Sequence, residues 1–249
     1  MEAEELERYA RHIVLREIGG PGQQKLKKAR VLVIGAGGLG SPVLMYLAAA
    51  GVGVLGIVDD DIVSLSNLQR QVLHDTDSVG VAKVVSATKA IARINPHVTV
   101  ETFHTRLVAE NASEIIANFD LVLDGSDNFD TRYLINEICV SLGKPLVSAA
   151  MSQWEGQISV YDTSSGGPCY ACVFPKRPAD GLAPSCAEAG IMGALAGVMG
   201  SMMASETIKY ITGAGEGLIG QMIIYDALYS ESRKMRMAKN LTCEVCGEK

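Results

Sequence analysis

Hydrophobic positions along the chain change their spacing repeatedly, and the changes predict alternating strands and helices. Apolar runs typical of strands occupy residues 31–35, 54–59, 98–103, 119–124 and 145–149. The three-to-four-residue spacing of helices is found between these runs, at residues 40–51, 79–94, 111–117 and 129–142. The alternation predicts the α/β class, with a Rossmann-like, doubly wound, mostly parallel sheet, helices on both faces and right-handed crossovers.

The pattern changes at both ends of this alternating region. Residues 156–161 and 220–225 alternate apolar and polar positions, which predicts antiparallel strands with one exposed face that continue the sheet. Residues 190–211 contain an apolar helical stretch that is too short for a membrane span, so a buried or interfacial helix is expected. Near the N-terminus, residues 4–17 have helical spacing, and the sequence GGPG at 19–22 is expected to end that helix.

Length and composition narrow the class of protein. The chain has 249 residues, of which 48% are hydrophobic and 20% charged, and this suits one soluble domain with a sizeable core. Its net charge of −6 argues against general nucleic-acid binding, for which a basic surface is expected. The acidic N-terminal sequence MEAEE lacks the pattern of a secretory signal, so a cytoplasmic location is expected.

The sequence GAGGLG at residues 35–40 follows the first predicted strand and opens the next helix, as a nucleotide-binding loop does. Gly35 allows the tight turn, Gly37 lets the backbone approach a phosphate, and Gly40 lets the helix pack closely. Asp59 ends the second strand, where a carboxylate hydrogen-bonds ribose hydroxyls. Because NAD and ATP both carry such a ribose, the loop predicts a nucleotide without identifying it.

Cationic and amide side chains follow the ribose-binding acid and favour a triphosphate. Asn67, Gln69 and Arg70 lie in the sequence SNLQRQ at residues 66–71, and Lys83 comes next, on the following helix. A single lysine on a helix is as often a solvated charge as a ligand. Together with Arg70, however, Lys83 would hold β- and γ-phosphates and neutralise charge as pyrophosphate leaves.

Two aspartates end or follow the fourth predicted strand, at the same edge of the sheet. Asp124 is expected to close a turn, which is the common role of such aspartates. Asp127 has two interpretations. It either caps the helix that begins near Phe129 or binds Mg²⁺ beside bound phosphates, and the second role is favoured.

Four of the six cysteines form two Cys-x-x-Cys pairs, Cys169 with Cys172 and Cys243 with Cys246. Two such pairs in a chain without a secretory signal predict a structural zinc knuckle with four cysteine ligands, and redox activity is the alternative. The metal would hold the C-terminus against the region after residue 150. Cys186 precedes a predicted helix, and it is either a thiol activated by the helix dipole or a small loop residue.

These residues resemble a known family, the E1-like adenylyltransferases of the MoeB/ThiF/HesA type. Five motifs occur in the family's order: RYARHIVL at residues 8–15, GAGGLG, SNLQRQ, DGSDN at 124–128 and the paired cysteines. The resemblance implies ATP-dependent adenylation of a C-terminal Gly-Gly carboxylate on a ubiquitin-like sulfur-carrier protein, which gives an acyl-adenylate and pyrophosphate. The motifs are most similar to those of the branch that serves molybdopterin synthase.

The resemblance also implies roles for individual residues: ATP at the glycine loop, Mg²⁺ at Asp127 and Zn²⁺ at the paired cysteines. Arg11 is implied to reach the phosphates of the partner subunit's site in a homodimer, and Cys186 to match a cysteine that some relatives link to the carrier. The residues implied in nucleotide binding are Gly35, Gly37, Gly38, Gly40, Asp59, Asp61, Ser66, Asn67, Leu68, Gln69, Arg70, Lys83, Asp127 and Asn128. The residues implied in catalysis are Arg11, Arg70, Lys83, Asp127 and Cys186.

One domain, residues 1–249, is expected to contain a helical arm (1–28), a nucleotide-binding half (29–150) and a carrier-binding half (151–249). Because no rhodanese-like domain follows Lys249, the sulfur donor is expected to be a separate protein. Three alternatives remain open: the same chemistry for a thiamin carrier, an NAD-dependent oxidoreductase, or a non-catalytic nucleotide-binding zinc scaffold. The net negative charge of the chain argues against the function of those relatives that activate a tRNA-bound carboxylate.

Overall fold

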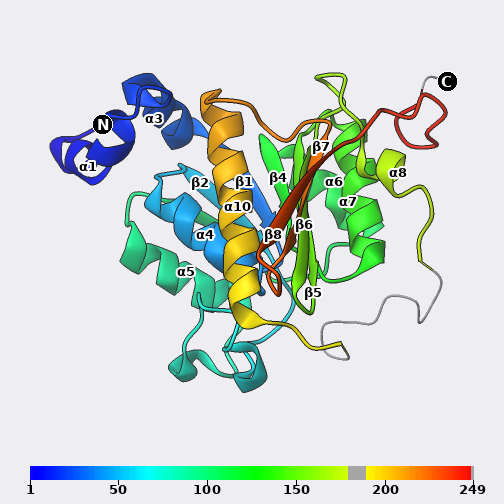
Figure 1. The fold of residues 1–249 in the computed structure, drawn as a ribbon. Coiled ribbons are helices and arrows are strands. Elements are labelled where there is room, and N and C mark those ends of the chain that lie inside the picture. Colours follow the sequence, from blue (N-terminus) through cyan, green and yellow to red (C-terminus); the bar gives the residue numbers. More distant parts are fainter. Residues whose placement is uncertain (179–188, 248–249) are drawn as a thin grey trace.

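A sheet of eight strands forms the centre of the computed structural model, which describes residues 1–178 and 189–247. The strand order is β3-β2-β1-β4-β5-β6-β7-β8. Figure 1 shows the strands at the centre of the molecule, with helices around them. The strands are β1 (Arg30–Ile34), β2 (Val54–Val58), β3 (Thr99–Phe103), β4 (Leu121–Asp124), β5 (Leu146–Ser152), β6 (Glu155–Tyr161), β7 (Gln221–Asp226) and β8 (Glu231–Arg236). Strands β1 to β5 are parallel, and β6, β7 and β8 continue the sheet antiparallel. This arrangement confirms the predicted fold class.

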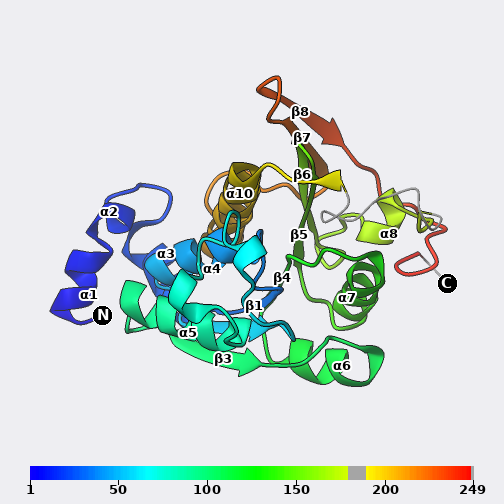
Figure 2. The same ribbon diagram turned by 90° about the horizontal axis from the view of Figure 1, so that it is seen from below.

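Helices cover both faces of the sheet (Figure 2). One face carries α4 (Gly40–Ala49), α5 (Lys83–Ile94) and α10 (Gly193–Thr212). The other face carries α6 (Ala109–Ala117), α7 (Phe129–Ser141) and α8 (Tyr170–Val173). Side chains of a strand alternate between faces, so Val31 and Val33 of β1 join the first core, whereas Leu32 and Ile34 join the second.

Helix α10 belongs to the core, as one of the two interpretations of its apolar sequence predicted. Its residues Leu195, Met199 and Met203 are fully buried. Gly200 allows α10 to approach α4 closely, because a Cβ at this position would lie 2.3 Å from Cγ of Pro42. Within the described chain, no helix is both long enough and apolar enough to cross a membrane.

The N-terminal segment differs from the single helix expected at residues 4–17. The structure has two short helices, α1 (Ala3–Arg8) and α2 (Ala10–Ile13), and then a longer helix, α3 (Gly19–Lys28). Tyr9 separates the first two, and its hydroxyl accepts a hydrogen bond from Asn95 at 2.8 Å. The GGPG sequence begins α3 instead of ending a helix. Gly19 turns the chain at a φ of 59°, and proline is tolerated in the first turn of a helix.

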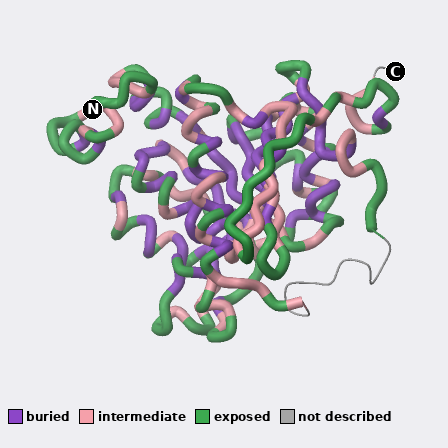
Figure 3. Tube along the Cα trace, viewed as in Figure 1, coloured by how far each residue is buried: buried purple, intermediate pink, exposed green. Residues whose placement is uncertain are grey.

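Two other segments depart from the hydrophobic pattern. Helix α5 begins at Lys83 rather than at 79, because the short 3₁₀ helix η2 (Thr76–Ser78) and a positive φ at Gly80 turn the chain first. Strand β8, which was not predicted, is exposed at every position (Figure 3). An edge strand without a buried face has no apolar alternation, so only its backbone pairing with β7 identifies it.

Candidate functional site

A cleft with a volume of about 1010 Å³ opens at the carboxyl ends of β1, β2 and β4. Parallel α/β sheets bind ligands at this edge, beside the point where the strand order reverses. The cleft wall includes most of the nucleotide-site candidates: Gly35, Gly37, Gly38, Asp59, Asp61, Arg70, Lys83, Asp127 and Asn128. The structure therefore brings these residues together, and their role in nucleotide binding remains a prediction.

Steric contacts explain why the loop between β1 and α4 contains glycines. Gly35 has a φ of 92°, and a Cβ there would lie 2.9 Å from the carbonyl oxygen of Gly125. A Cβ at Gly40 would lie only 1.9 Å from the carbonyl oxygen of Gly35. At Gly37, by contrast, the nearest atom would be Nε2 of Gln71 at 3.6 Å. Packing thus requires glycine at positions 35 and 40. At Gly37 the absence of a side chain leaves the backbone of the loop accessible to a ligand in the cleft.

Asp59 connects the end of β2 to the glycine loop. Its Oδ2 accepts the N–H of Ala36 at 2.7 Å, and its Oδ1 accepts the N–H of Asp61 at 2.9 Å. Burial raises the pKa of the Asp59 carboxyl above its ordinary value, against the opposing effect of the Lys83 charge and of these N–H donors. Each carboxylate oxygen retains a lone pair, so the predicted contact with ribose hydroxyls is compatible with these bonds.

Lys83 is not the solvated charge that a lone helical lysine would be. Its side chain is 5% exposed, and its ammonium group forms a 2.8 Å ion pair with Asp61, whose side chain is 69% exposed. Arg70 also lines the cleft, and its Nη1 donates to the carbonyl oxygen of Ser66 at 3.2 Å. Two positive charges therefore reach the cleft from the connection after β2.

Gln71 lines the cleft beside Arg70, whereas the first four residues of the SNLQRQ segment lie outside the cleft wall of the described chain. Asn67 ends the short 3₁₀ helix η1 (Leu65–Asn67), and its carbonyl oxygen accepts the N–H groups of Arg70 and Gln71. Gln69 packs against Gly193 at the start of α10, where a Cβ would lie 2.3 Å from its backbone and side-chain oxygens. Direct nucleotide contacts of Ser66, Asn67, Leu68 and Gln69 remain predictions.

The two aspartates near β4 have different surroundings. Asp124 is fully buried, and its Oδ1 accepts the N–H of Ser126 at 3.0 Å, so it closes a turn as expected. The cap of α7 is Asn128, whose side chain accepts the N–H of Thr131 at 2.9 Å. Asp127 is not the cap residue, and it lies exposed in the cleft wall. The position of Asp127 therefore fits a cation ligand better than a helix cap.

Arg132 is a residue of the cleft that sequence reasoning missed. It is 6% exposed, and its Nε lies 3.1 Å from Oδ2 of Asp124. Its Nη2 donates to the carbonyl oxygens of Ser126 at 2.9 Å and Ala149 at 3.1 Å. Burial lowers the pKa of the Arg132 guanidinium, but Asp124, Tyr170 and Tyr161 together outweigh this effect, and the net shift is upward. No sequence signal marks an arginine inside a helix whose partners come from other elements.

His74 is a second residue that sequence reasoning missed, because the four histidines of the chain have no ligand spacing. It is 6% exposed, and its Nε2 lies 2.9 Å from the carbonyl oxygen of Ala36. A carbonyl only accepts, so Nε2 carries the proton, and Nδ1 of the neutral ring accepts from Ser86 Oγ at 2.9 Å. Burial lowers the pKa of the His74 imidazole.

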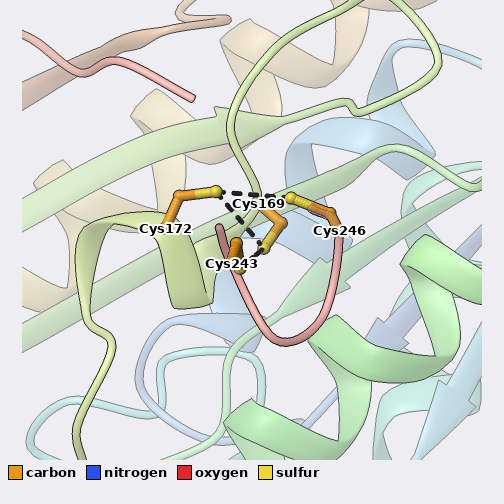
Figure 4. A group of neighbouring side chains, drawn as sticks. All are labelled: Cys169, Cys172, Cys243 and Cys246. Carbon is orange, nitrogen blue, oxygen red and sulfur yellow. Dashed lines mark hydrogen bonds between the residues drawn. The ribbon is translucent and has the colours of Figure 1, made fainter. Parts of the chain in front are cut away.

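The four paired cysteines converge although the pairs lie far apart in the sequence (Figure 4). Their sulfur atoms all lie within 4.8 Å of one another. The Sγ–Sγ distances are 3.8 Å for Cys169–Cys172, 3.7 Å for Cys169–Cys243 and 3.3 Å for Cys172–Cys246. A tetrahedral zinc site with Zn–S bonds of about 2.3 Å requires sulfur separations of about 3.8 Å. The cluster thus fits the predicted zinc knuckle.

The cleft wall of the described chain does not include two other catalytic candidates, Arg11 and Cys186. Arg11 is exposed on α2. The neighbouring Tyr9 packs against Gly51, which precedes β2, whereas the cleft lies where β2 ends. Cys186 lies outside the described residues, so its activated-thiol and loop interpretations both stay open.

Known proteins resemble this chain along most of its length. A family model described as "ThiF family" matches residues 9–245. The sulfur carrier protein adenylyltransferase of Thermus thermophilus is 51% identical over 249 residues, covering 98% of this chain and 92% of its own length. The adenylyltransferase and sulfurtransferase MOCS3 of Dictyostelium discoideum is 46% identical and covers 98% of this chain, which spans 58% of that protein. The crystal structure of E. coli MccB with ATP matches with a TM-score of 0.85 at 23% identity, covering 97% of this chain and 75% of that one, and shows the same fold.

Proposed function

This chain belongs to the ThiF family and is an E1-like adenylyltransferase, and we propose that its substrate is the C-terminal glycine carboxylate of a ubiquitin-like sulfur-carrier protein. The reaction would transfer AMP from ATP to that carboxylate and release pyrophosphate. The cleft carries this proposal, because an accessible glycine loop, the cations Arg70 and Lys83 and the Asp127 carboxylate line it together. The name of the T. thermophilus relative, sulfur carrier protein adenylyltransferase, supports the choice of substrate.

The cations of the cleft would act on the phosphates of ATP. Arg70 and Lys83 would reduce the repulsion between triphosphate and incoming carboxylate, and they would stabilise pyrophosphate as it leaves. The ion pair with Asp61 already holds the Lys83 ammonium at the cleft wall, so little reorganisation is needed when a phosphate arrives. Asp127 would hold Mg²⁺, which when bound neutralises phosphate charge.

The attacking carboxylate needs orientation rather than a general base, because it is ionised at neutral pH. Beyond its phosphate end, the cleft continues along β5, β6 and β7, past Met151, Gln157 and Ile224. An extended C-terminal tail of the carrier would lie along this extension and place its last glycine at the glycine loop. Residues after 150 would therefore contribute the carrier-binding half.

The proposal extends to the assembly and the pathway. Arg11 would reach the cleft of the partner subunit in a homodimer, and the four cysteines would hold Zn²⁺ as a structural ion. The reaction would serve molybdopterin biosynthesis in the cytoplasm, and a separate protein would donate the sulfur. A carrier for the thiazole of thiamin is the alternative, since the relatives' names do not distinguish the two carriers.

Carrier-dependent exchange of labelled pyrophosphate into ATP tests the proposed reaction. Wild-type protein should catalyse exchange only with the carrier present, and Asp127→Ala and Arg70→Ala should each lower the rate at least about a hundredfold. Asp130→Asn is the matched control, because Asp130 is an exposed carboxylate near the start of α7 that pairs with Arg177 outside the cleft wall of the described chain. Full exchange by Asp127→Ala would refute the site assignment.

Other outcomes would replace the proposal. Carrier binding without pyrophosphate release would indicate a non-catalytic scaffold. Binding of NADH without binding of ATP would indicate an oxidoreductase. Parallel exchange assays with a molybdopterin-type and a thiamin-type carrier would identify the pathway, because the cognate carrier should support the faster exchange.

A further inference from the structure

Helix α7 connects the cleft to the cysteine cluster through two buried polar residues one turn apart. Arg132 contacts the loop that carries Asp127, and Asn136 contacts Cys169. Their spacing of four residues places both side chains on the same side of the helix. Arg132 is 6% exposed and Asn136 1% exposed, so neither contact is a surface feature.

At the cleft end, the backbone of Ser126 is held on both sides. Asp124 accepts the backbone N–H and the hydroxyl of Ser126 at 3.0 and 2.5 Å, and Arg132 donates to the Ser126 carbonyl at 2.9 Å. Arg132 is itself anchored by the Ala149 carbonyl at 3.1 Å. Because Ser126 directly precedes Asp127, displacement of the Arg132 guanidinium would displace the carboxylate that is proposed to hold Mg²⁺.

Tyr170 completes the connection at the cysteine end. It follows Cys169 directly, it is 3% exposed, and its ring centre lies 5.9 Å from the guanidinium carbon of Arg132. Two neighbouring tyrosine rings pack edge-on against it at 5.3 and 5.7 Å, which limits its freedom. The backbone N–H of Tyr170 donates to Asn136 Oδ1 at 2.8 Å, and Asn136 Nδ2 donates to Cys169 Sγ at 3.8 Å.

We propose that Tyr170 and Arg132 are positioning residues, through which a metal bound at the four cysteines orders the Asp127 loop and strengthens binding of the Mg²⁺–ATP complex. The inference rests on the proposed function, because it gives Asp127 the Mg²⁺ role. A metal that fixes Cys169 in a tetrahedral site also fixes the start of α8, and with it the ring against which Arg132 packs. Coupling between two binding sites is reciprocal, so bound nucleotide should strengthen metal binding by the same factor.

Equilibrium binding tests the inference without relying on turnover. Calorimetric titrations with α,β-methylene ATP, with and without Mg²⁺, would compare zinc-loaded wild-type protein with Tyr170→Leu. Loss of the ring should weaken binding about tenfold in the presence of Mg²⁺ and leave Mg²⁺-free binding unchanged. Tyr170→Phe keeps the ring and should restore the Mg²⁺-dependent affinity.

Tyr161→Leu is the matched control, because Tyr161 is a buried tyrosine of the same cluster but not the ring against which Arg132 packs. It should lower stability as Tyr170→Leu does without changing the Mg²⁺ dependence of nucleotide binding. If Tyr170→Leu fails to fold, Arg132→Lys serves as the second test. It keeps the positive charge but loses the guanidinium that donates hydrogen bonds to the carbonyl oxygens of both Ser126 and Ala149.

Zinc affinity provides the reciprocal measurement. Competition with a chromophoric chelator should show that Mg²⁺ and α,β-methylene ATP together raise the zinc affinity of wild-type protein about tenfold, and that Tyr170→Leu loses this rise. Equal Mg²⁺-dependent nucleotide affinities in wild type, Tyr170→Leu and Arg132→Lys would overturn the inference and leave carrier-dependent exchange untouched. Absence of that exchange in wild type would overturn the proposed function, whereas a shift in Tyr170→Leu would still establish the coupling.

Discussion

Polar side chains that are buried or half-buried hold the walls of the cleft in place. Asp59 accepts the N–H of Ala36 and His74 donates to its carbonyl, so both backbone groups of one glycine-loop residue are fixed. The sequence identified Asp59 as a candidate ligand because it ends the strand after the nucleotide-binding loop. It identified Lys83 because this lysine follows on the next helix. It gave His74 no such role, because its partners Ala36 and Ser86 lie 38 and 12 residues away and meet it only in the folded chain.

His74 predicts a pH dependence of stability. Burial lowers the pKa of its imidazole, so the folded chain binds this proton less readily than the unfolded chain, whose histidines titrate near pH ~6.5. The stabilisation from the neutral ring is therefore complete above about pH 6.5, and it is lost as the pH falls through the folded pKa. Urea denaturation from pH 8 down to 5 should show a smaller loss of unfolding free energy in His74→Gln than in wild type.

The control for this prediction is His104→Gln, which replaces an exposed histidine. It should retain the wild-type pH dependence of the unfolding free energy. Identical pH dependences in wild type and His74→Gln would show that the buried imidazole does not contribute, and would contradict the prediction.

Elements with one apolar face could be predicted to within a few residues, because burial imposes a period on the sequence. Helix α7 was expected at residues 129–142 and extends from Phe129 to Ser141. Helix α3 and strand β8 could not be predicted in this way. The GGPG start of α3 favours turns in isolation, and β8 is exposed at every position, so packing and backbone pairing decide both elements.

The junction between β1 and α4 offers a matched pair of glycine variants. Gly40→Ala would place Cβ 1.9 Å from the carbonyl oxygen of Gly35, so the backbone must shift, and the free energy of unfolding should fall by about 1–3 kcal/mol. Gly37→Ala meets no atom nearer than Gln71 Nε2 at 3.6 Å, so stability should stay within about 0.5 kcal/mol of wild type. The methyl group would nevertheless occupy space at the proposed phosphate site, and ATP should bind at least about tenfold more weakly.

Urea denaturation and nucleotide titration separate the two effects of these glycine variants. Equal unfolding free energies for Gly40→Ala and Gly37→Ala would contradict the packing argument. Wild-type ATP affinity in Gly37→Ala would contradict the placement of phosphate at this glycine.

Long-range packing brings together parts of the site that lie far apart in the sequence. The cysteine pairs were predictable as one cluster because Cys-x-x-Cys spacing is a chemical signal, even though Cys169 and Cys243 lie 74 residues apart. The path from Cys169 through Tyr170 to Arg132 was not predictable, because it exists only where α7 packs beside α8. Arg11 is a third case, since its motif resembles a catalytic one while its helix lies away from the cleft of its own chain.

Mixing two impaired variants tests whether Arg11 acts across a dimer. Arg11→Ala alone should lower carrier-dependent exchange by about 10³–10⁵-fold, as for other arginines that stabilise transferring phosphates from a partner. Co-expression with Asp127→Ala should give mixed dimers in which one cleft combines Asp127 of one chain with Arg11 of the other. About half of randomly formed two-fold dimers are mixed and each has one intact cleft, so about a quarter of the wild-type rate should return. Mass spectrometry would confirm the mixed dimers, and their presence without any recovery of exchange would show that Arg11 does not act in the partner's cleft.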